Sequence, residues 1–437
     1  MPTNCHKLPP KELDLKTALV KEQELLSRAE VPVVTVSATY KKELSEKYEK
    51  PAQARGDVVF SRAHYSMARA VVEAAKRLNQ SSHLVDPTNF VSAKDWKTVQ
   101  FTETVGKLMA RFKVLKWLKD RIDTAARNKL PITEAIAKPL EFLTRDINRP
   151  VISLHYEVGN QLASWLRPVI QVVTDPHIRP QYLYALPSEQ ITYCVFDQAT
   201  KKDLLKEAAR QNRFINQDKI IITGPPVDPR ISIVAKNKNN LNKDSVLNLA
   251  VCTGGLGTNL PEIKEVLTQL KSWLRPPAKI RLFLYAGTHR HFRDYFEDYA
   301  RELNVRVGDL NDKQAAIRIL YDDSIIDANE NLIKYMFPWA EGVITKPSGD
   351  MAYEAAAAGC FLLFLESWGE WEENIQKRFI QRKIGYDLKV WRSFHQLKSL
   401  WSRGSLKEAM INAKKLPLIF RQGAENIVKA QQKQLGC

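Results

Sequence analysis

A glycine-rich turn in the second half of the chain is the first segment whose residue types suggest ligand chemistry. It follows the apolar run VLNLAVC and reads TGGLGTNLPEIKEV (residues 253–266). The residues of this turn that suit contact with a ligand are Gly254, Gly255, Gly257 and Thr258. Glycines let the backbone approach an anion closely, and a hydroxyl can add a hydrogen bond. The turn therefore suits a diphosphate, although such a turn alone is more often simple turn chemistry and lacks the Lys-Ser/Thr pair of a P-loop.

A second polar turn interrupts the stretch GVITKPSGDMAYEAAAAGCFLLF (residues 342–364). A strand-like run ends there in a polar break that contains Lys346, Ser348 and Gly349. The alanine-rich helix that follows permits close packing, and it carries Glu354 one turn in. This carboxylate could accept hydrogen bonds from ribose hydroxyls, or it could be a helix cap or a member of an ion pair.

A third turn, ESWGEWEENIQ (residues 366–376), follows the next apolar run and contains Glu370 and Asn374. In open parallel sheets, ligands bind beyond the carboxyl ends of the strands, where helix N-termini direct N–H groups toward them. Three polar turns on one sheet edge therefore predict a nucleotide site. A departing diphosphate needs its charge neutralised, and Lys346 or Arg230 could supply the cation.

Alternating strand-like and helical segments surround these turns. They form one series in residues 57–230 and a second in residues 231–395. Such alternation predicts parallel sheets covered by helices. We therefore expect an α/β protein with two Rossmann-like domains facing each other across a cleft, and helices in residues 396–437 that pack back on them. The mostly charged residues 1–56 are expected to form an extension before the first strand, GDVVF.

Three motifs in the first domain complete a family resemblance. They are RAHYSMARAV (residues 62–71), VVTDPH (residues 172–177) and KIIITGPPVDPRI (residues 219–231). Together with the three turns, they resemble glycosyltransferase family 28, which includes the murein-lipid N-acetylglucosaminyl transferases and the monogalactosyldiacylglycerol synthases. The resemblance covers roughly residues 57–391. It implies the GT-B architecture, in which the first domain binds the acceptor and the second holds a nucleotide sugar.

The resemblance also implies roles for the donor-side residues. The turn from Gly254 to Thr258 would hold the diphosphate, Glu354 the ribose, and the turn from Glu370 to Asn374 the sugar. Glu370 and Trp371 depart from the residues that the family commonly has at the sugar-contacting positions, so the identity of the sugar does not carry over. Met351 stands where the family usually has a threonine, so the hydroxyl contact to the nucleotide does not carry over either.

On the acceptor side, the resemblance implies that His64 is the general base. A histidine that titrates near neutral pH suits this role, which is to take a proton from the acceptor hydroxyl as that hydroxyl attacks the anomeric carbon. Asp175 would orient it, and His177 and Glu157 are competing candidates. The glycines that precede the family's histidine are replaced here by Ser-Arg-Ala at residues 61–63.

The charge of the chain favours an anionic partner. Its 437 residues carry a formal net charge of +17, which suits nucleic acid, a phosphorylated substrate or lipid headgroups. The segment KLMARFKVLKWLKDRI (residues 107–122) could lie on an anionic membrane surface, or it could pack on the first sheet as a surface helix. No apolar run reaches signal-peptide or membrane-spanning length, and the five scattered cysteines form no C-x-x-C pair. We therefore expect a cytoplasmic protein with reduced thiols, with peripheral binding to the inner membrane face left open.

These features predict a hexosyltransferase that moves a sugar from a nucleotide-diphosphate sugar to a hydroxyl acceptor by inverting displacement. UDP-linked donors are the first candidates, and a lipid is one candidate acceptor. Metal-ligand spacing is missing, so neither a metal nor a cofactor besides the donor is expected. One alternative is a nucleotide-sugar epimerase or hydrolase with the same architecture. Another is a noncatalytic protein that binds nucleic acid or an anionic surface, although no RNP-like motif favours nucleic acid.

Overall fold

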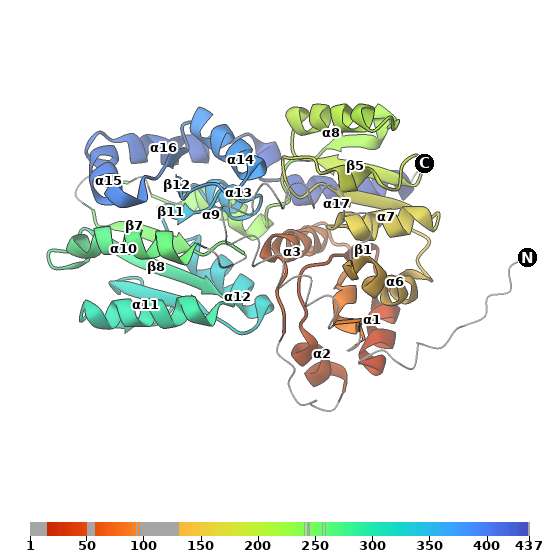
Figure 1. Cartoon of the computed structure of the whole chain (residues 1–437), viewed down its shortest axis with the longest axis horizontal. Coiled ribbons are helices and arrows are strands. Elements are labelled where there is room, and N and C mark those ends of the chain that lie inside the picture. The colour runs from red at the N-terminus through yellow and green to blue at the C-terminus, as the bar shows by residue number, and fades with distance from the viewer. Residues whose placement is uncertain are drawn as a thin grey trace, which may run out of the picture.

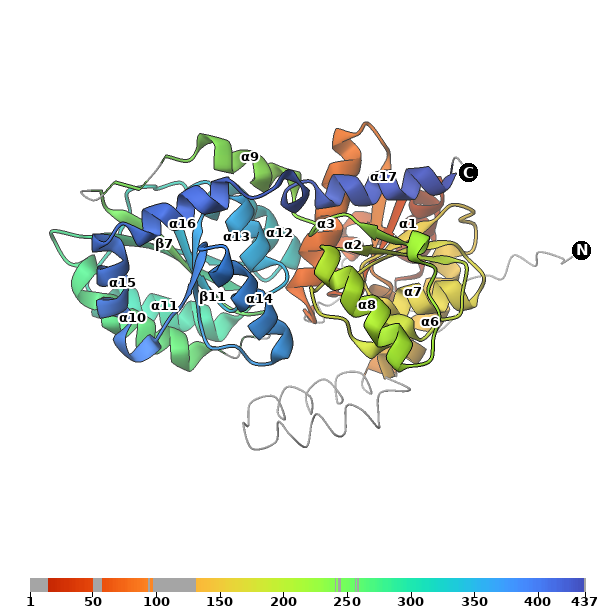
Figure 2. The same ribbon diagram turned by 90° about the horizontal axis from the view of Figure 1, so that it is seen from above.

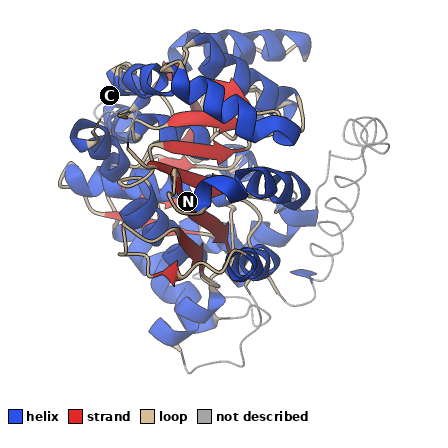
Figure 3. Ribbon diagram, turned by 90° about the vertical axis from the view of Figure 1, so that its left-hand side faces the viewer, coloured by secondary structure: helices blue, strands red, loops and turns tan. Residues whose placement is uncertain are grey.

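The computed structural model describes residues 15–49, 57–92, 95–96, 131–239, 241–242, 245–255, 257 and 259–435. These residues form two parallel sheets, one of six strands and one of seven, with helices packed around them. Figure 1 shows the two α/β domains side by side, and Figure 3 shows strands at the centre with helices outside them. The predicted fold class, two Rossmann-like domains, is confirmed.

The first sheet has the strand order β2-β1-β3-β4-β5-β6, and every neighbouring pair is parallel. Its strands are β1 (Val31–Val34), β2 (Ser82–Val85), β3 (Val151–Ser153), β4 (Val169–Val172), β5 (Ile191–Val195) and β6 (Ile220–Ile222). Its helices are α1 (Lys16–Arg28), α2 (Lys41–Tyr48), α3 (Arg62–Arg77), α6 (Pro131–Thr144), α7 (Tyr156–Ser164) and α8 (Gln198–Arg210). All residues of β1, β3, β4 and β5 are buried, as expected for a parallel sheet covered on both faces.

Strand β1 lies within the segment that the sequence assigned to an extension. It pairs with β2 on one side and β3 on the other, so residues 31–34 are an inner strand of the first sheet. The described part of GDVVF, predicted as the first strand, forms only an isolated antiparallel bridge between Val59 and Ala38. The strand prediction for this region is therefore wrong at both places.

The second sheet has the order β13-β12-β11-β7-β8-β10-β9 and is also parallel throughout. Its strands are β7 (Leu247–Cys252), β8 (Ile280–Gly287), β9 (Val307–Gly308), β10 (Ile317–Tyr321), β11 (Gly342–Thr345), β12 (Phe361–Phe364) and β13 (Gly385–Asp387). Helices of this domain are α9 (Pro229–Asn237), α10 (Leu260–Leu274), α11 (Arg290–Glu302), α12 (Ile325–Asn331), α13 (Met351–Ala357), α14 (Glu370–Gln381), α15 (Ser393–Ser402) and α16 (Ser405–Lys414). Every residue of the alanine-rich α13 is buried, because its small side chains let it pack closely against its neighbours.

The last helix, α17 (Gly423–Leu435), returns to the first domain. Figures 1 and 2 both show it beside α3, far from α15 and α16. Its Gln431 is fully buried, and Gln431 Nε2 donates to Glu30 O at 3.0 Å and to Pro150 O at 3.3 Å. The prediction that the C-terminal helices pack back on the domains is confirmed.

Replacing Gln431 by Ala is expected to lower the free energy of unfolding by about 1–3 kcal/mol, because the buried Pro150 O and the partly buried Glu30 O both lose their donor. Urea unfolding followed by circular dichroism measures the change. Gln432→Ala, at the next position of the same helix and partly exposed, is the matched control and should change stability by less than about 0.5 kcal/mol. Equal effects of the two substitutions would contradict the role assigned to Gln431.

The basic segment at residues 107–122, predicted as a surface or membrane-surface helix, lies outside the described residues. Within the part of the chain that the structure describes, no helix combines the length and apolar character needed to cross a bilayer.

Candidate functional site

The strand order of the second sheet reverses between β7 and β11. The chain enters at β7, continues to β8 and β10 on one side, and later adds β11, β12 and β13 on the other. Ligands of such sheets bind at this reversal, beyond the carboxyl ends of the two strands. Those ends carry the glycine-rich turn after β7 and the Lys-Pro-Ser-Gly-Asp turn after β11. The topology thus places the first two predicted turns next to each other.

The glycine-rich turn is held by the start of α10. The N–H of Gly254 donates to Asn259 Oδ1 at 3.2 Å, and the N–H of Gly257 donates to Gly254 O at 2.8 Å. Gly257 has a φ of +60°, and a Cβ there would lie 2.9 Å from the His289 ring, so glycine is required at this position. Thr258 lies outside the described residues. The backbone therefore folds closely over a helix N-terminus, which is the geometry of an anion site.

Lys346 lies against this turn. A Cβ added to Gly254 would be 3.4 Å from Lys346 Cδ. Lys346 is only 5% exposed, and its Nζ lies 4.5 Å from the centre of the Trp368 ring and 3.8 Å from Glu372 Oε2. Two predicted donor-site elements are thus brought together. The sequence did not single out Glu372, whose Oε2 also accepts a hydrogen bond from the backbone N–H of Trp368 at 2.6 Å.

Gly349 brings the second domain into contact with the first. A Cβ on Gly349 would lie 2.3 Å from Asp175 Oδ1 and 2.7 Å from Thr174 O, so no side chain fits between them. The preceding residue, Ser348, accepts a hydrogen bond from the Met351 N–H at 3.2 Å and so shapes the start of α13. The predicted donor turn and the predicted acceptor loop therefore meet across the cleft.

Glu354 is a member of a buried ion pair. Arg62 Nη2 lies 2.9 Å from Glu354 Oε2, and Arg62 Nη1 lies 2.7 Å from Asp350 Oδ2. Burial raises the pKa of Glu354 to about 7 despite the opposing effect of Arg62. The pKa of Asp350 is lowered, because the Arg62 guanidinium and local hydrogen bonds outweigh its burial. Of the roles left open for Glu354, the structure shows the ion-pair member.

His64 lies in the first turn of α3 and faces the loop after β4. Its Nε2 is 3.1 Å from Thr174 Oγ1, which in turn is 3.1 Å from the Tyr182 hydroxyl. The His155 ring packs edge-on against His64, with 5.1 Å between ring centres. Burial lowers the pKa of His64 to about 4, and Arg179 acts in the same direction. The imidazole is therefore neutral at pH 7, and the burial that keeps it neutral also makes it a weaker base than an ordinary histidine.

Asp175, the predicted partner of His64, lies next to Thr174, which contacts the His64 ring. Asp175 Oδ2 is 3.9 Å from Arg179 Nη2. Burial raises the pKa of Asp175, and Arg179 offsets part of this effect. The orienting role of Asp175 stays a prediction.

The competing candidates for the base differ in position. Glu157 is buried, and its Oε2 accepts a hydrogen bond from Thr133 Oγ1 of α6 at 2.8 Å, so it is directed into the first domain. His177 is partly exposed, and burial and Arg179 both lower its pKa. His64 is therefore the candidate that lies beside both the Thr174 loop and the start of α3.

The third predicted turn precedes α14. Glu370 is the first residue of that helix and is exposed, and Asn374 is partly buried one turn later. Trp371 faces the first domain, with its ring centre 5.7 Å from the Arg179 guanidinium carbon. The turn therefore borders the cleft on the side of Lys346.

Four residues near the cleft were not found from the sequence as candidates, namely Arg62, His155, Thr174 and Tyr182. Arg62 carried the clearest signal, since it stands two positions before His64 where the family that the sequence resembles has a glycine. The other three lie near His64 because loops that are distant from it in sequence fold against the start of α3.

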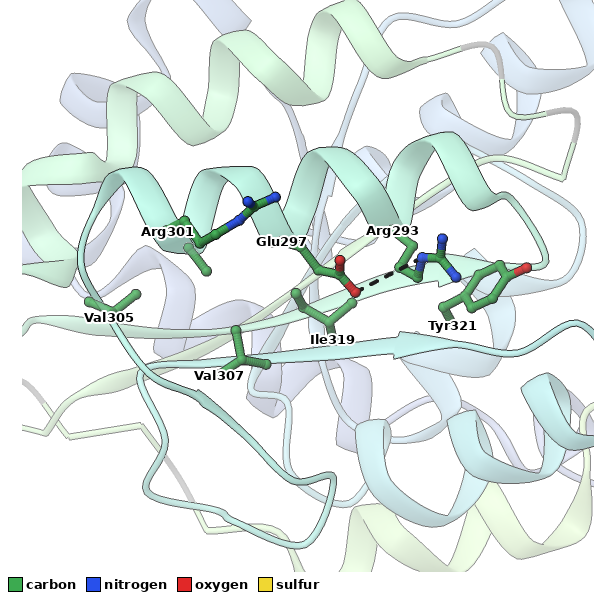
Figure 4. Close-up of a pocket in the computed structure, with 8 residues that line it drawn as sticks. Arg293, Glu297, Arg301, Val305, Val307, Ile319 and Tyr321 are labelled. Carbon is green, nitrogen blue, oxygen red and sulfur yellow. Dashed lines mark ion pairs between the residues drawn. The ribbon is translucent and has the colours of Figure 1, made fainter.

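The described residues contain no group of three or more His, Cys, Asp and Glu side chains arranged to hold a metal ion. A separate groove of 590 Å³ lies between α11 and strands β9 and β10 (Figure 4). Its rim includes Arg293 and Glu297, whose charged groups are 3.9 Å apart. None of the predicted site residues lines it.

Comparisons with known proteins identify the fold. No protein-family model and no curated protein matches the chain. A solved structure of the trehalose-6-phosphate synthase OtsA is 14% identical, with a TM-score of 0.51 over 92% of this chain and 98% of that one. An apo structure of OtsA is 13% identical, with a TM-score of 0.52 over 93% and 99%. The chain therefore has the GT-B fold.

MurG from Acinetobacter baumannii also aligns, with 13% identity over 92% of this chain and 99% of that one. Its TM-score of 0.48 is too low to bear on family membership. Membership of glycosyltransferase family 28 stays a prediction.

Proposed function

We propose that the chain is a glycosyltransferase that moves a sugar from a nucleotide-diphosphate sugar to a hydroxyl acceptor. The observation that carries the proposal is the contact of Gly349 with Asp175 and Thr174, because it joins the turn suited to the donor with the loop that faces His64. A transferase needs its donor and its base on opposite sides of one reaction centre. UDP-linked sugars are the first donors to test, and a hydroxyl-bearing lipid is one candidate acceptor.

The proposed reaction is a single displacement. His64, neutral at pH 7, takes the proton of the acceptor hydroxyl as its oxygen forms a bond to the anomeric carbon. The bond from that carbon to the diphosphate oxygen breaks, and the nucleoside diphosphate leaves with the electron pair. Attack from the face opposite the leaving group inverts the anomeric configuration.

The leaving diphosphate gains negative charge as the bond breaks. The N-terminus of α10, which follows the glycine-rich turn, offers a positive dipole, and Lys346 lies beside the turn. These groups can stabilise the charge without a metal ion.

Thermal unfolding with a panel of nucleotide sugars tests the proposal. A donor present at 100 times its Kd is expected to stabilise the protein by about 2.7 kcal/mol. Transfer is then assayed with labelled donor and a panel of hydroxyl acceptors. Release of free sugar or its epimer without any acceptor would favour a hydrolase or epimerase instead, and the lack of any shift across the panel would contradict the proposal.

Gly257→Ala tests the glycine-rich turn. It is expected to reduce the stabilisation that nucleotide sugars produce in thermal unfolding. Its Cβ would meet the His289 ring at 2.9 Å, and its φ of +60° would be strained. Gly404→Ala is the control, because Gly404 also has a positive φ, of +76°, but open space around it. Gly404→Ala should lose about 1 kcal/mol of stability and keep the full nucleotide shift.

A further inference from the structure

Arg62 joins the two domains through its side chain. It belongs to α3 of the first domain, and all of its described side-chain partners belong to the second. Its Nη1 donates to Asp350 Oδ2 at 2.7 Å, and its Nη2 lies 3.1 Å from Asn329 Oδ1 and 2.9 Å from Glu354 Oε2. Arg62 is 6% exposed, so these contacts replace water around the guanidinium. Opening of the cleft at this point must therefore break a buried, charge-assisted contact.

The burial of this contact sets it apart from other ion pairs across the cleft. The side chains of Arg62 and Glu354 are 7% and 4% exposed. The pair of Arg69 and Glu330 is 28% and 34% exposed, and that of Arg378 and Asp197 is 17% and 23% exposed. Since water weakens exposed pairs, the Arg62 contact is the one expected to hold the domains most firmly.

The same contact occupies the carboxylate on which the proposed nucleotide site depends. Glu354 is the side chain suited to ribose hydroxyls, and its Oε2 faces Arg62. The backbone of Arg62 also borders the diphosphate turn, because a Cβ on Gly255 would lie 3.9 Å from Arg62 N. The Nε of Arg62 is buried and lacks a hydrogen-bond partner among the described residues, so within that part of the chain the guanidinium has a donor to spare.

We propose, on the basis of the function proposed above, that Arg62 is a donor-site residue contributed by the acceptor domain. While no nucleotide is bound, it holds the two domains together by pairing with both Asp350 and Glu354. When a nucleotide enters, Arg62 yields the Glu354 carboxylate to the ribose. Arg62 keeps Asp350 as a partner in the exchange, and the incoming diphosphate adds negative charge beside the guanidinium, so the buried cation stays balanced.

The test uses the whole protein with Arg62→Gln, and Arg77→Gln as the control. Arg77 lies in the last turn of the same helix and is exposed. Small-angle X-ray scattering without nucleotide should give a larger radius of gyration for Arg62→Gln than for the wild type and the control. Calorimetric titration with neutral ribonucleosides, beginning with uridine, should give a Kd for Arg62→Gln about tenfold lower. A tenfold change in Kd is expected if the form in which Arg62 pairs with Glu354 makes up about nine-tenths of the molecules without nucleoside.

Two comparisons keep the test decisive. Arg62→Gln leaves two carboxylates without their cation, so the double variant Asp350→Asn/Glu354→Gln, which removes both carboxylates from the other side of the contact, should also enlarge the radius of gyration. An unchanged radius in both variants, or weaker nucleoside binding by Arg62→Gln, would overturn the proposal. A different result separates the two proposals. If no nucleotide binds the wild type but both variants have a larger radius of gyration, the role of Arg62 in holding the domains together is supported and the proposed donor is wrong.

Discussion

Replacing His64 by Ala is expected to lower kcat for sugar transfer by about 10²- to 10⁴-fold, with the Kd of the donor unchanged. The imidazole is the neutral acceptor that lies at the start of α3 beside the Thr174 loop, and its loss leaves the attacking hydroxyl protonated. The donor turns belong to the second domain, so donor binding does not depend on the imidazole. Initial rates at saturating donor, together with calorimetric titration of the donor, separate the two quantities.

His395→Ala is the matched control, because His395 is exposed on α15, away from the cleft, and its loss should leave kcat unchanged. The pH profile gives a second readout. A base with an ordinary pKa would lose activity below about pH 6.5. Since burial lowers the pKa of His64 to about 4, the acid limb of kcat/KM should fall near pH 4 instead. Full activity of His64→Ala would remove His64 from the role of base.

The parallel fold could be predicted because its signal is local. Most strands are short apolar runs followed by a helix, and this alternation is visible over both halves of the chain. The error at β1 has a physical reason. Val31–Val34 pairs with β2, about fifty residues later, and with β3, more than a hundred residues later, so no neighbouring segment identifies it as a strand.

The candidate site also has one part that could be predicted from the sequence and one part that could not. The turns after β7 and β11 could be predicted because the carboxyl ends of parallel strands share one edge of the sheet. The contacts across the cleft could not, because they join segments from different domains. Arg62 and Asp350 are 288 positions apart, and no periodicity links them. Glu354 shows the consequence, since the sequence left three roles open and the structure shows its ion pair with Arg62.

Replacing Gly349 by Ala is expected to abolish most sugar transfer while the melting temperature stays close to that of the wild type. The added Cβ would lie 2.3 Å from Asp175 Oδ1 and 2.7 Å from Thr174 O, and the second of these atoms belongs to the backbone and cannot rotate away. The clash lies between the domains and not within either core, so each domain should fold normally. The domains must then move apart by an ångström or more, and a displacement of that size costs about 100-fold in rate when it separates reacting groups.

Three measurements on Gly349→Ala identify the cause of the loss. The melting temperature reports on folding, nucleotide binding reports on the second domain, and kcat reports on the assembled cleft. Loss of kcat alone is the expected pattern, and Gly349→Val, with a bulkier side chain, should lower kcat further. Wild-type turnover by Gly349→Ala would show that the contact between Gly349 and the Asp175 loop is not needed for the reaction. The reaction centre would then have to be assembled by other contacts than those on which the proposed function rests.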